Sequence, residues 1–143
     1  MISIIVTTYN GAKYLAAQLD SILAQTYTGL EIILSDDAST DDTWAIAQRY
    51  AAKDPRIVLI RHEKNVGLHA NLGGALERAT GMYIAISDQD DIWRSDKIEK
   101  QLSLLGCAVG VYSDSALIDA AGNSIGFTPV SYTHLRAHET VLD

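Results

Sequence analysis

Three aspartates, Asp88, Asp90 and Asp91, lie within four positions, directly after a run typical of a buried strand, Ile84–Ser87. Carboxylates this close repel one another, and a bound cation would relieve the repulsion. Crowded carboxylate oxygens suit a hard divalent ion, Mg²⁺ or Mn²⁺, which keeps coordination positions open for water and substrate phosphates. The alternative is a solvated acidic turn. We predict a divalent-metal site here. Which substrate the metal would serve depends on the elements placed beside it.

Composition limits the classes of protein to which the chain can belong. Its 143 residues, 48% hydrophobic, suffice for one domain with a real core. A net charge of −7 argues against a nucleic-acid partner, which needs a basic surface. A single cysteine, no signal-peptide pattern and no apolar run long enough to span a bilayer favour a cytoplasmic protein. Peripheral membrane association through a partner stays open.

The hydrophobic pattern alternates between β-branched runs and apolar residues at helical spacing. The predicted strands are Ile2–Thr8, Leu30–Ser35, Ile57–Ile60, Met82–Ser87 and Ala108–Ser113. The predicted helices run from Tyr14 to Gln25, from a cap at Thr40 or Asp41 to Lys53, from Leu68 to Thr80, and from a cap at Ser95 to Leu105. A hairpin is expected to begin in 116–123. This alternation predicts a mostly parallel, doubly wound α/β sheet with helices on both faces.

Three of the predicted strands end in side chains that can contact a nucleotide. Thr7 and Tyr9 close the first strand, Asp37 follows the second and Asp88 the fourth. Ligands of open parallel sheets bind beyond the carboxyl ends of the strands. An aromatic ring for stacking, a carboxylate for a base N–H and a metal for a diphosphate would together form a nucleoside-diphosphate pocket. Taken singly, Tyr9 could instead be a half-buried strand-end aromatic and Asp37 a cap or turn residue.

Other nucleotide-binding and acidic folds fit the sequence less well. The first strand is followed by neither the glycine fingerprint of a dinucleotide-binding domain nor the Gly-Lys-Ser/Thr sequence of a P-loop. A receiver domain needs acids after its first and third strands, and a sugar-nucleotide pyrophosphorylase needs a glycine-rich basic loop after the first. The sequence Thr8–Gly11 meets neither requirement.

Five motifs resemble the N-terminal, nucleotide-sugar-binding half of family-2 inverting glycosyltransferases of the GT-A fold, a Rossmann-like fold. They are Ser3–Asn10, Ser21–Thr26, Glu31–Asp41, Asn65–Gly67 and Ser87–Trp93. The resemblance implies that Thr7, Tyr9 and Asp37 hold the base. It also implies that Asp88, Asp90 and Asp91 form a DxD-type cluster at the ribose and the metal-bound diphosphate, with Asp88 as a nucleotide ligand and Asp90 and Asp91 as metal ligands.

The resemblance also implies an activity. A family member of this kind transfers a sugar from a UDP- or dTDP-sugar to a saccharide or lipid-linked saccharide acceptor with inversion. The reaction depends on Mg²⁺ or Mn²⁺ and serves cell-surface polysaccharide synthesis at the inner face of the membrane. The sequence Ser87–Trp93 is similar to that of hexosyl- and rhamnosyltransferases that build polysaccharides.

The family places its acceptor site and general base in a C-terminal half that this chain is expected to lack. We therefore expect a partial glycosyltransferase domain over residues 1–128 and a disordered tail, foreign to the fold, over 129–143. Asp114 and Asp119, the last acids before that tail, are better read as structural or substrate-edge residues than as the base. The catalytic base is left unassigned and the chain alone is expected to be inactive. The alternative function is a nucleotide-sugar-binding module without turnover.

Overall fold

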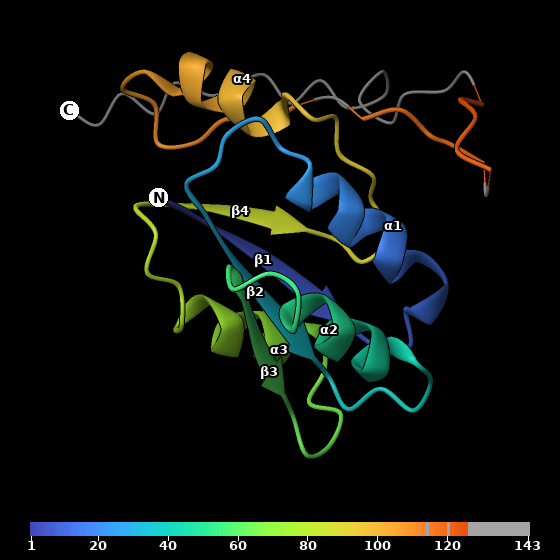
Figure 1. Cartoon of the computed structure of the whole chain (residues 1–143). Helices are drawn as coiled ribbons and strands as arrows, with labels where there is room; N and C mark the ends of the chain where they lie inside the picture. The colour runs from blue at the N-terminus through green and yellow to red at the C-terminus, as the bar shows by residue number, and fades with distance from the viewer. Residues whose placement is uncertain (114, 120, 126–143) are drawn as a thin grey trace. The chain divides into compact units, whose positions relative to one another are not determined.

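The computed structural model describes residues 1–113, 115–119 and 121–125 (Figure 1). The chain divides into two compact units, Met1–Lys100 and Gln101–Asp143. The strands are β1 (Ile2–Thr8), β2 (Leu30–Asp36), β3 (Ile57–Arg61) and β4 (Tyr83–Ser87). The helices are α1 (Ala12–Leu23), α2 (Thr43–Ala51), α3 (Leu68–Leu76) and α4 (Lys97–Leu105). All four strands and three of the helices belong wholly to the first unit.

The four strands form one parallel sheet in the order β3-β2-β1-β4. Strand β1 lies at its centre, with Val6 opposite Leu34 of β2 and Ser87 of β4. Every residue of β1 is buried, as expected of an Ile- and Val-rich strand that is covered on both faces. The register brings the carboxyl ends of β1, β2 and β4 to the same edge.

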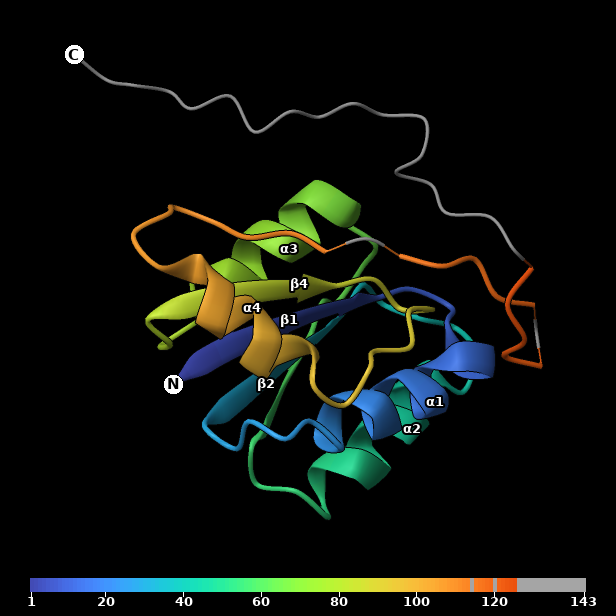
Figure 2. The same cartoon turned by 90° about the horizontal axis from the view of Figure 1, so that it is seen from above.

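Helices cover both faces of this sheet. Helix α3 lies on one side and α1 and α2 on the other, as Figure 2 shows. On the α3 side, Ala75 packs with Ile5 and Ile33 of the two central strands. This arrangement confirms the predicted parallel, doubly wound α/β sheet.

Polar side chains make hydrogen bonds at the starts of three helices. Asp41 Oδ1 accepts from Thr43 N–H at 3.0 Å at the start of α2, and its Oδ2 accepts from Ala12 N–H at 3.1 Å at the start of α1. The N-cap of α2 is Asp42, not Thr40 or Asp41 as predicted, and its side chain makes no capping bond. Asp41, one residue earlier, joins the starts of the two helices instead. At the start of α4, Gln25 Oε1 accepts from Ile98 N–H at 3.1 Å, close to the expected cap at Ser95.

Two strand predictions need correction. Residues 108–113 form no strand, and Val109 and Tyr112 are exposed, because no strand of the described chain pairs with this glycine-containing segment. Strand β4 is not buried as predicted, since it lies at the edge of the described sheet, where Ile84 and Ile86 are exposed. Helix α3 also ends earlier than predicted, at Leu76, where hydrogen bonds between residues three apart tighten the chain into a turn.

The second unit contains an antiparallel bridge between Ile118 and Ser124. Asp119 N–H donates to the Asn123 carbonyl at 2.9 Å, and Gly122 takes the positive φ of 84° that the turn requires. The predicted hairpin therefore exists as one bridge and its turn. Asp114 and the predicted tail, 129–143, lie outside the described residues.

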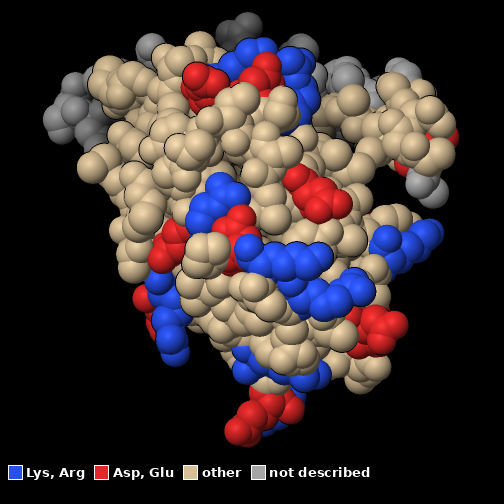
Figure 3. All heavy atoms as spheres, viewed as in Figure 1, with Lys and Arg blue, Asp and Glu red and all other residues tan. Residues whose placement is uncertain are grey.

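Within the described residues, none of the helices is long and apolar enough to cross a membrane. Acidic and basic side chains are both distributed over the face of the molecule shown in Figure 3.

Candidate functional site

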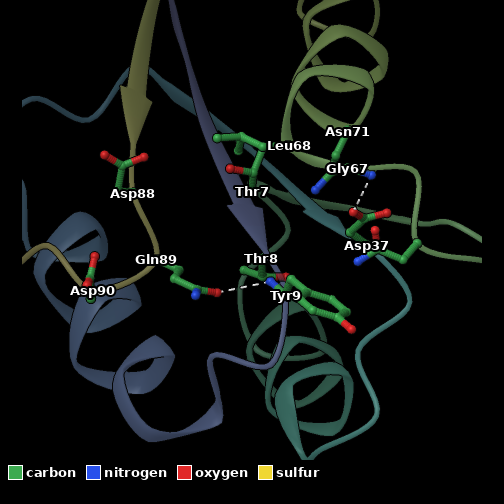
Figure 4. Close-up of a pocket in the computed structure, with 11 residues that line it drawn as sticks. Thr7, Thr8, Tyr9, Asp37, Gly67, Leu68, Asn71, Asp88, Gln89 and Asp90 are labelled. Atoms are coloured by element: carbon green, nitrogen blue, oxygen red, sulfur yellow. Dashed lines mark hydrogen bonds between the residues drawn. The ribbon is translucent and has the colours of Figure 1, made fainter.

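A pocket of about 330 Å³ lies beyond the carboxyl ends of β1, β2 and β4 (Figure 4). Strand β1 and the residue after it supply Thr7–Tyr9, the segment after β2 supplies Asp37, and the loop after β4 supplies Asp88–Asp90. The remaining lining residues precede α3 or lie in its first turns: Asn65, Gly67, Leu68 and Asn71. The structure thus brings five of the six predicted site residues to one pocket, whereas Asp91 does not line it.

Asp37 is buried between the end of β2 and the start of α3. Its Oδ1 accepts from Val66 N–H at 2.7 Å and its Oδ2 from Gly67 N–H at 2.9 Å. Its own N–H donates to the Thr8 carbonyl at 2.9 Å, which joins the ends of β1 and β2. Asp37 therefore has a structural role, because it ties the segment after β2 to the loop before α3. Each carboxylate oxygen carries more than one acceptor site, so Asp37 can also accept a hydrogen bond from a ligand in the pocket.

Tyr9 stands at the pocket with 46% of its surface exposed. The following residue, Asn10, has a positive φ of 51° and turns the chain away from β1. Asn10 N–H donates to Ser39 Oγ at 2.9 Å, and Asn10 Oδ1 accepts from Thr40 N–H at 2.8 Å. The turn is thereby attached to the segment after β2, while the Tyr9 ring remains accessible.

The acidic loop, Asp88–Asp91, turns back on itself, with Asp91 N–H donating to the Asp88 carbonyl at 3.2 Å. Burial raises the pKa of Asp91, and the negative charges of Asp88 and Asp90 raise it further, while the Lys97 ammonium acts in the opposite direction. The pKa of Lys97 is lowered by burial, which the charge of Asp91 partly offsets. The repulsion expected from the sequence is therefore present in the folded loop.

The donor atoms of this loop suit a hard divalent cation. Carboxylate oxygens are the ligands that Mg²⁺ and Mn²⁺ prefer, and the repulsion at Asp91 would fall when a cation binds. The described part of the chain contains no group of three or more His, Cys, Asp or Glu side chains already arranged to hold a metal. Mg²⁺ is commonly bound in proteins by one or two carboxylates together with water and substrate phosphates.

Polar residues of α1, and Gln25 just after its end, hold the acidic loop and the segment after it. Gln18 is fully buried, and its Nε2 donates to Ser87 Oγ at 2.8 Å and also to the Asp88 carbonyl. Ser21 Oγ accepts from Trp93 N–H at 3.0 Å, and Gln25 Nε2 donates to the Arg94 carbonyl at 2.6 Å. Our sequence interpretation gave these residues no role. The signal for Gln18 was a polar side chain on the otherwise apolar buried face of the helix, beside Leu15, Leu19 and Ile22.

Gln89 also escaped the sequence interpretation. Its side chain crosses from the acidic loop to β1, where Oε1 accepts from Tyr9 N–H at 3.0 Å (Figure 4). No periodic pattern marks this residue, because the bond joins positions 80 apart.

A sequence profile described as Glycosyl transferase family 2 matches residues 3–112. The chain is 41% identical over 105 residues to UDP-Glc:alpha-D-GlcNAc-diphosphoundecaprenol beta-1,3-glucosyltransferase WfaP of Escherichia coli, which covers 73% of this chain and 41% of that relative. The chain spans 38% to 42% of the length of this and two Bacillus subtilis relatives.

Solved glycosyltransferase structures share the fold. Mannosyltransferase PcManGT from Pyrobaculum calidifontis, in complex with GDP-Man and Mn²⁺, matches with a TM-score of 0.70 at 31% identity and covers 82% of this chain and 35% of that protein. S. aureus TarS 1-349 in complex with UDP-GlcNAc matches with a TM-score of 0.69 at 24% identity, covering 82% of this chain and 40% of that one. The profile over most of the chain and the shared architecture show that the chain belongs to glycosyl transferase family 2 and has the GT-A fold.

Proposed function

We propose that the pocket binds the nucleoside diphosphate of a UDP- or dTDP-sugar, and that the whole enzyme transfers the sugar to a saccharide acceptor with inversion. The observation that carries the proposal is the convergence of Tyr9, Asp37 and Asp88 from three strand ends on one pocket. The name of the WfaP relative, which specifies UDP-Glc, supports a uridine donor.

The roles of the nucleotide ligands follow from their placement. The exposed ring of Tyr9 would stack on the base. The Thr7 hydroxyl and the remaining acceptor sites of Asp37 would contact the polar edge of the base. Asp88, across the pocket from Asp37, would accept from a ribose hydroxyl (Figure 4).

Asp90 and Asp91 would hold Mg²⁺ or Mn²⁺ against the diphosphate. A bound divalent ion neutralises charge on the leaving group, which can contribute several kcal/mol of transition-state stabilisation. Without that charge compensation, the acidic loop would repel a diphosphate. Nucleotide binding by this chain should therefore require the ion.

The transfer itself is an in-line displacement. The acceptor hydroxyl oxygen bonds to the anomeric carbon while the bond from that carbon to the diphosphate oxygen breaks, and the bonding pair leaves with the diphosphate. The hydroxyl proton passes to a general base, whose assistance is worth about 10²–10⁴-fold. The base must lie on the sugar face opposite the diphosphate, away from Asp88–Asp91. We assign no residue of this chain to that role.

A second candidate function is a nucleotide-sugar-binding module without turnover. The chain spans 38% to 42% of the length of three relatives, so transfer is proposed for the whole protein and donor binding for this chain. For the whole protein we propose a lipid-linked saccharide acceptor, by analogy with the diphosphoundecaprenol in the WfaP name, and a cytoplasmic location with peripheral association at the inner membrane face.

Titration calorimetry of the chain with UDP tests the proposal. Binding is expected with Mg²⁺ or Mn²⁺ and is expected to disappear in EDTA. The Asp90→Ala/Asp91→Ala variant should lose the metal-dependent binding, whereas Asp42→Ala/Glu77→Ala, which removes two exposed acids outside the pocket, should keep it. Tight binding in EDTA, or unchanged binding by the first variant, would contradict the metal assignment. Absence of UDP binding under all conditions would contradict the proposed function.

A further inference from the structure

Gln89 connects two sides of the pocket. It sits between Asp88 and Asp90 in the acidic loop, and its Oε1 accepts from the backbone N–H of Tyr9 at 3.0 Å. Figure 4 shows the side chain extending across the floor of the pocket toward β1. The end of β1 that carries Tyr9 is thereby tied to the loop that carries the acids.

Gly11 leaves the space that the Gln89 amide occupies. A methyl group on Gly11 would lie 2.4 Å from Gln89 Oε1 and 2.9 Å from Gln89 Cδ, which is too close for either atom to stay in place. The backbone of Gly11 has φ −104° and ψ 17°, which alanine also adopts. Backbone conformation therefore does not require glycine at this position, and the effect of a methyl group there would be to displace the Gln89 amide, the movable end of its side chain, from Tyr9 N–H.

We infer that Gln89 is a positioning residue of the nucleotide pocket: it sets the Tyr9 backbone relative to Asp88 and Asp90, and Gly11 provides the room for it to do so. This inference rests on the proposed function and adds a determinant of affinity to it. Gln89 acts here through its side-chain oxygen.

The physical reason is that Tyr9 and the acidic loop contact opposite ends of one ligand. A base and a diphosphate are joined covalently, so the ring and the acids must be held at matching positions. If the two sides move independently, the ligand must order them when it binds, and that ordering weakens the affinity. Loss of one neutral hydrogen bond of this kind corresponds to about a three- to tenfold weaker binding.

A double-mutant cycle tests the coupling between Gln89 and Gly11. Calorimetry with UDP and Mn²⁺ would compare the unmodified chain with Gly11→Ala, Gln89→Ala and the double variant. Each single change should weaken binding about three- to tenfold. The double variant should bind no more weakly than Gln89→Ala alone, because the added methyl group then meets no amide. Effects that multiply, or single variants that bind as the unmodified chain does, would overturn the inference.

A second comparison isolates the acceptor oxygen and does not depend on the Gly11 variant. Gln89→Glu keeps an oxygen that can accept from Tyr9 N–H, whereas Gln89→Met keeps the length of the side chain without that acceptor. The probe is metal-free uridine, whose base and ribose still span Tyr9 and Asp88 but which has no diphosphate to feel the added charge. Gln89→Glu should bind it as the unmodified chain does, and Gln89→Met several-fold more weakly.

Equal uridine binding by these two variants would overturn the positioning role while UDP binding by the unmodified chain upheld the pocket. Failure of the unmodified chain to bind UDP with Mn²⁺ would overturn the proposed function, and this inference with it.

Discussion

The Tyr9 side chain is held at the pocket by its backbone and little by packing. Its N–H bonds to Gln89 Oε1, the next residue turns toward Ser39 and Thr40, and 46% of Tyr9 remains exposed. An exposed ring on a fixed backbone suits stacking, since binding need not displace the ring from a core. At the scale of single residues, we therefore expect Tyr9 to affect affinity more than stability.

Replacement of Tyr9 with Ala is expected to weaken UDP binding by about 1–3 kcal/mol, the range for base–aromatic stacking. The melting temperature should change little, because little buried surface is lost. Tyr14→Ala is the matched control, since Tyr14 is 40% exposed on α1 and does not line the pocket. Calorimetry and a thermal melt decide the matter. A Tyr9→Ala chain that is strongly destabilised yet retains its affinity would identify the ring as a structural aromatic.

Helix α1 is the element that fixes the acidic loop. Gln18 and Ser21 of α1, and Gln25 just after its end, bond to the chain between Ser87 and Ile98, so the loop is held by this part of the chain as well as by the sheet. Another polar connection, at Asp41, joins the starts of α1 and α2. Removal of a bond to the acidic-loop segment should lower both stability and nucleotide affinity, whereas removal of the Asp41 bonds should lower stability.

Gln25→Ala is expected to lower both stability and nucleotide affinity. The change leaves the Arg94 carbonyl and the Ile98 N–H without their partner, at a cost of about 1–3 kcal/mol for a buried polar group. Because the same segment carries the chain away from Asp91, metal-dependent UDP binding should weaken as well. Gln48→Ala, an exposed glutamine of α2, is the control for chemical denaturation and calorimetry. Loss of stability with unchanged UDP affinity would show that α1 does not position the loop.

Asp41→Ala is expected to lower the free energy of unfolding by about 1 kcal/mol at pH 7, the typical net value of one hydrogen bond. Burial raises the pKa of Asp41, but hydrogen bonds from Thr43 and Ala12 outweigh it and leave the pKa below its ordinary value of 3.8. The charged form is thus favoured on folding, so its contribution is complete above pH 3.8 and is lost as the pH falls below that value.

The control for this prediction is Asp42→Ala. Asp42 precedes the first residue of α2 but makes no side-chain capping bond. Urea unfolding of both variants across pH gives the comparison. Equal stability of the two at pH 7 would contradict a special role for Asp41.

On the scale of the whole molecule, the described residues form a pocket proposed for the sugar donor. No residue of this chain is assigned to the acceptor. The strand ends at Thr8, Asp36 and Ser87 form the pocket, while the chain spans 38% to 42% of the length of three relatives. We therefore expect the 143-residue chain to bind donor and to hydrolyse it at most slowly, without transfer. An assay with UDP-glucose and saccharide acceptors checks this. Robust transfer by this chain alone would contradict the assignment of the general base to another part of the whole protein.

Much of the fold could be predicted because local sequence determines it. The β-branched run of β1 and the polar residues at the ends of β1, β2 and β4 are visible in short windows, and parallel pairing brings those ends together. Gln18 could not be placed in this way, since it bonds to Ser87 across 69 positions. Contacts of that kind depend on the packed structure.

The strand predicted at 108–113 failed for a related reason. Apolar β-branched residues show that a segment can form a strand, but a strand also needs a neighbour, and within the described residues none pairs with Val109 or Tyr112. The exposed side chains of β4 have the same origin, because the sequence does not show which strand lies at the edge of the sheet. The sequence therefore predicts where strands end better than it predicts which strands lie at the edge of the sheet.

The most direct test of the pocket assignment is an NMR titration of the amide-labelled chain with UDP and Mg²⁺. We predict that the shifted amide signals come from the ends of β1, β2 and β4 and from the start of α3, including Tyr9, Asp37, Gly67 and Asp88. Replacing Mg²⁺ with paramagnetic Mn²⁺ should broaden the signals of Asp90 and Asp91 most strongly. Shifts centred on another surface, or broadening remote from the acidic loop, would contradict the account.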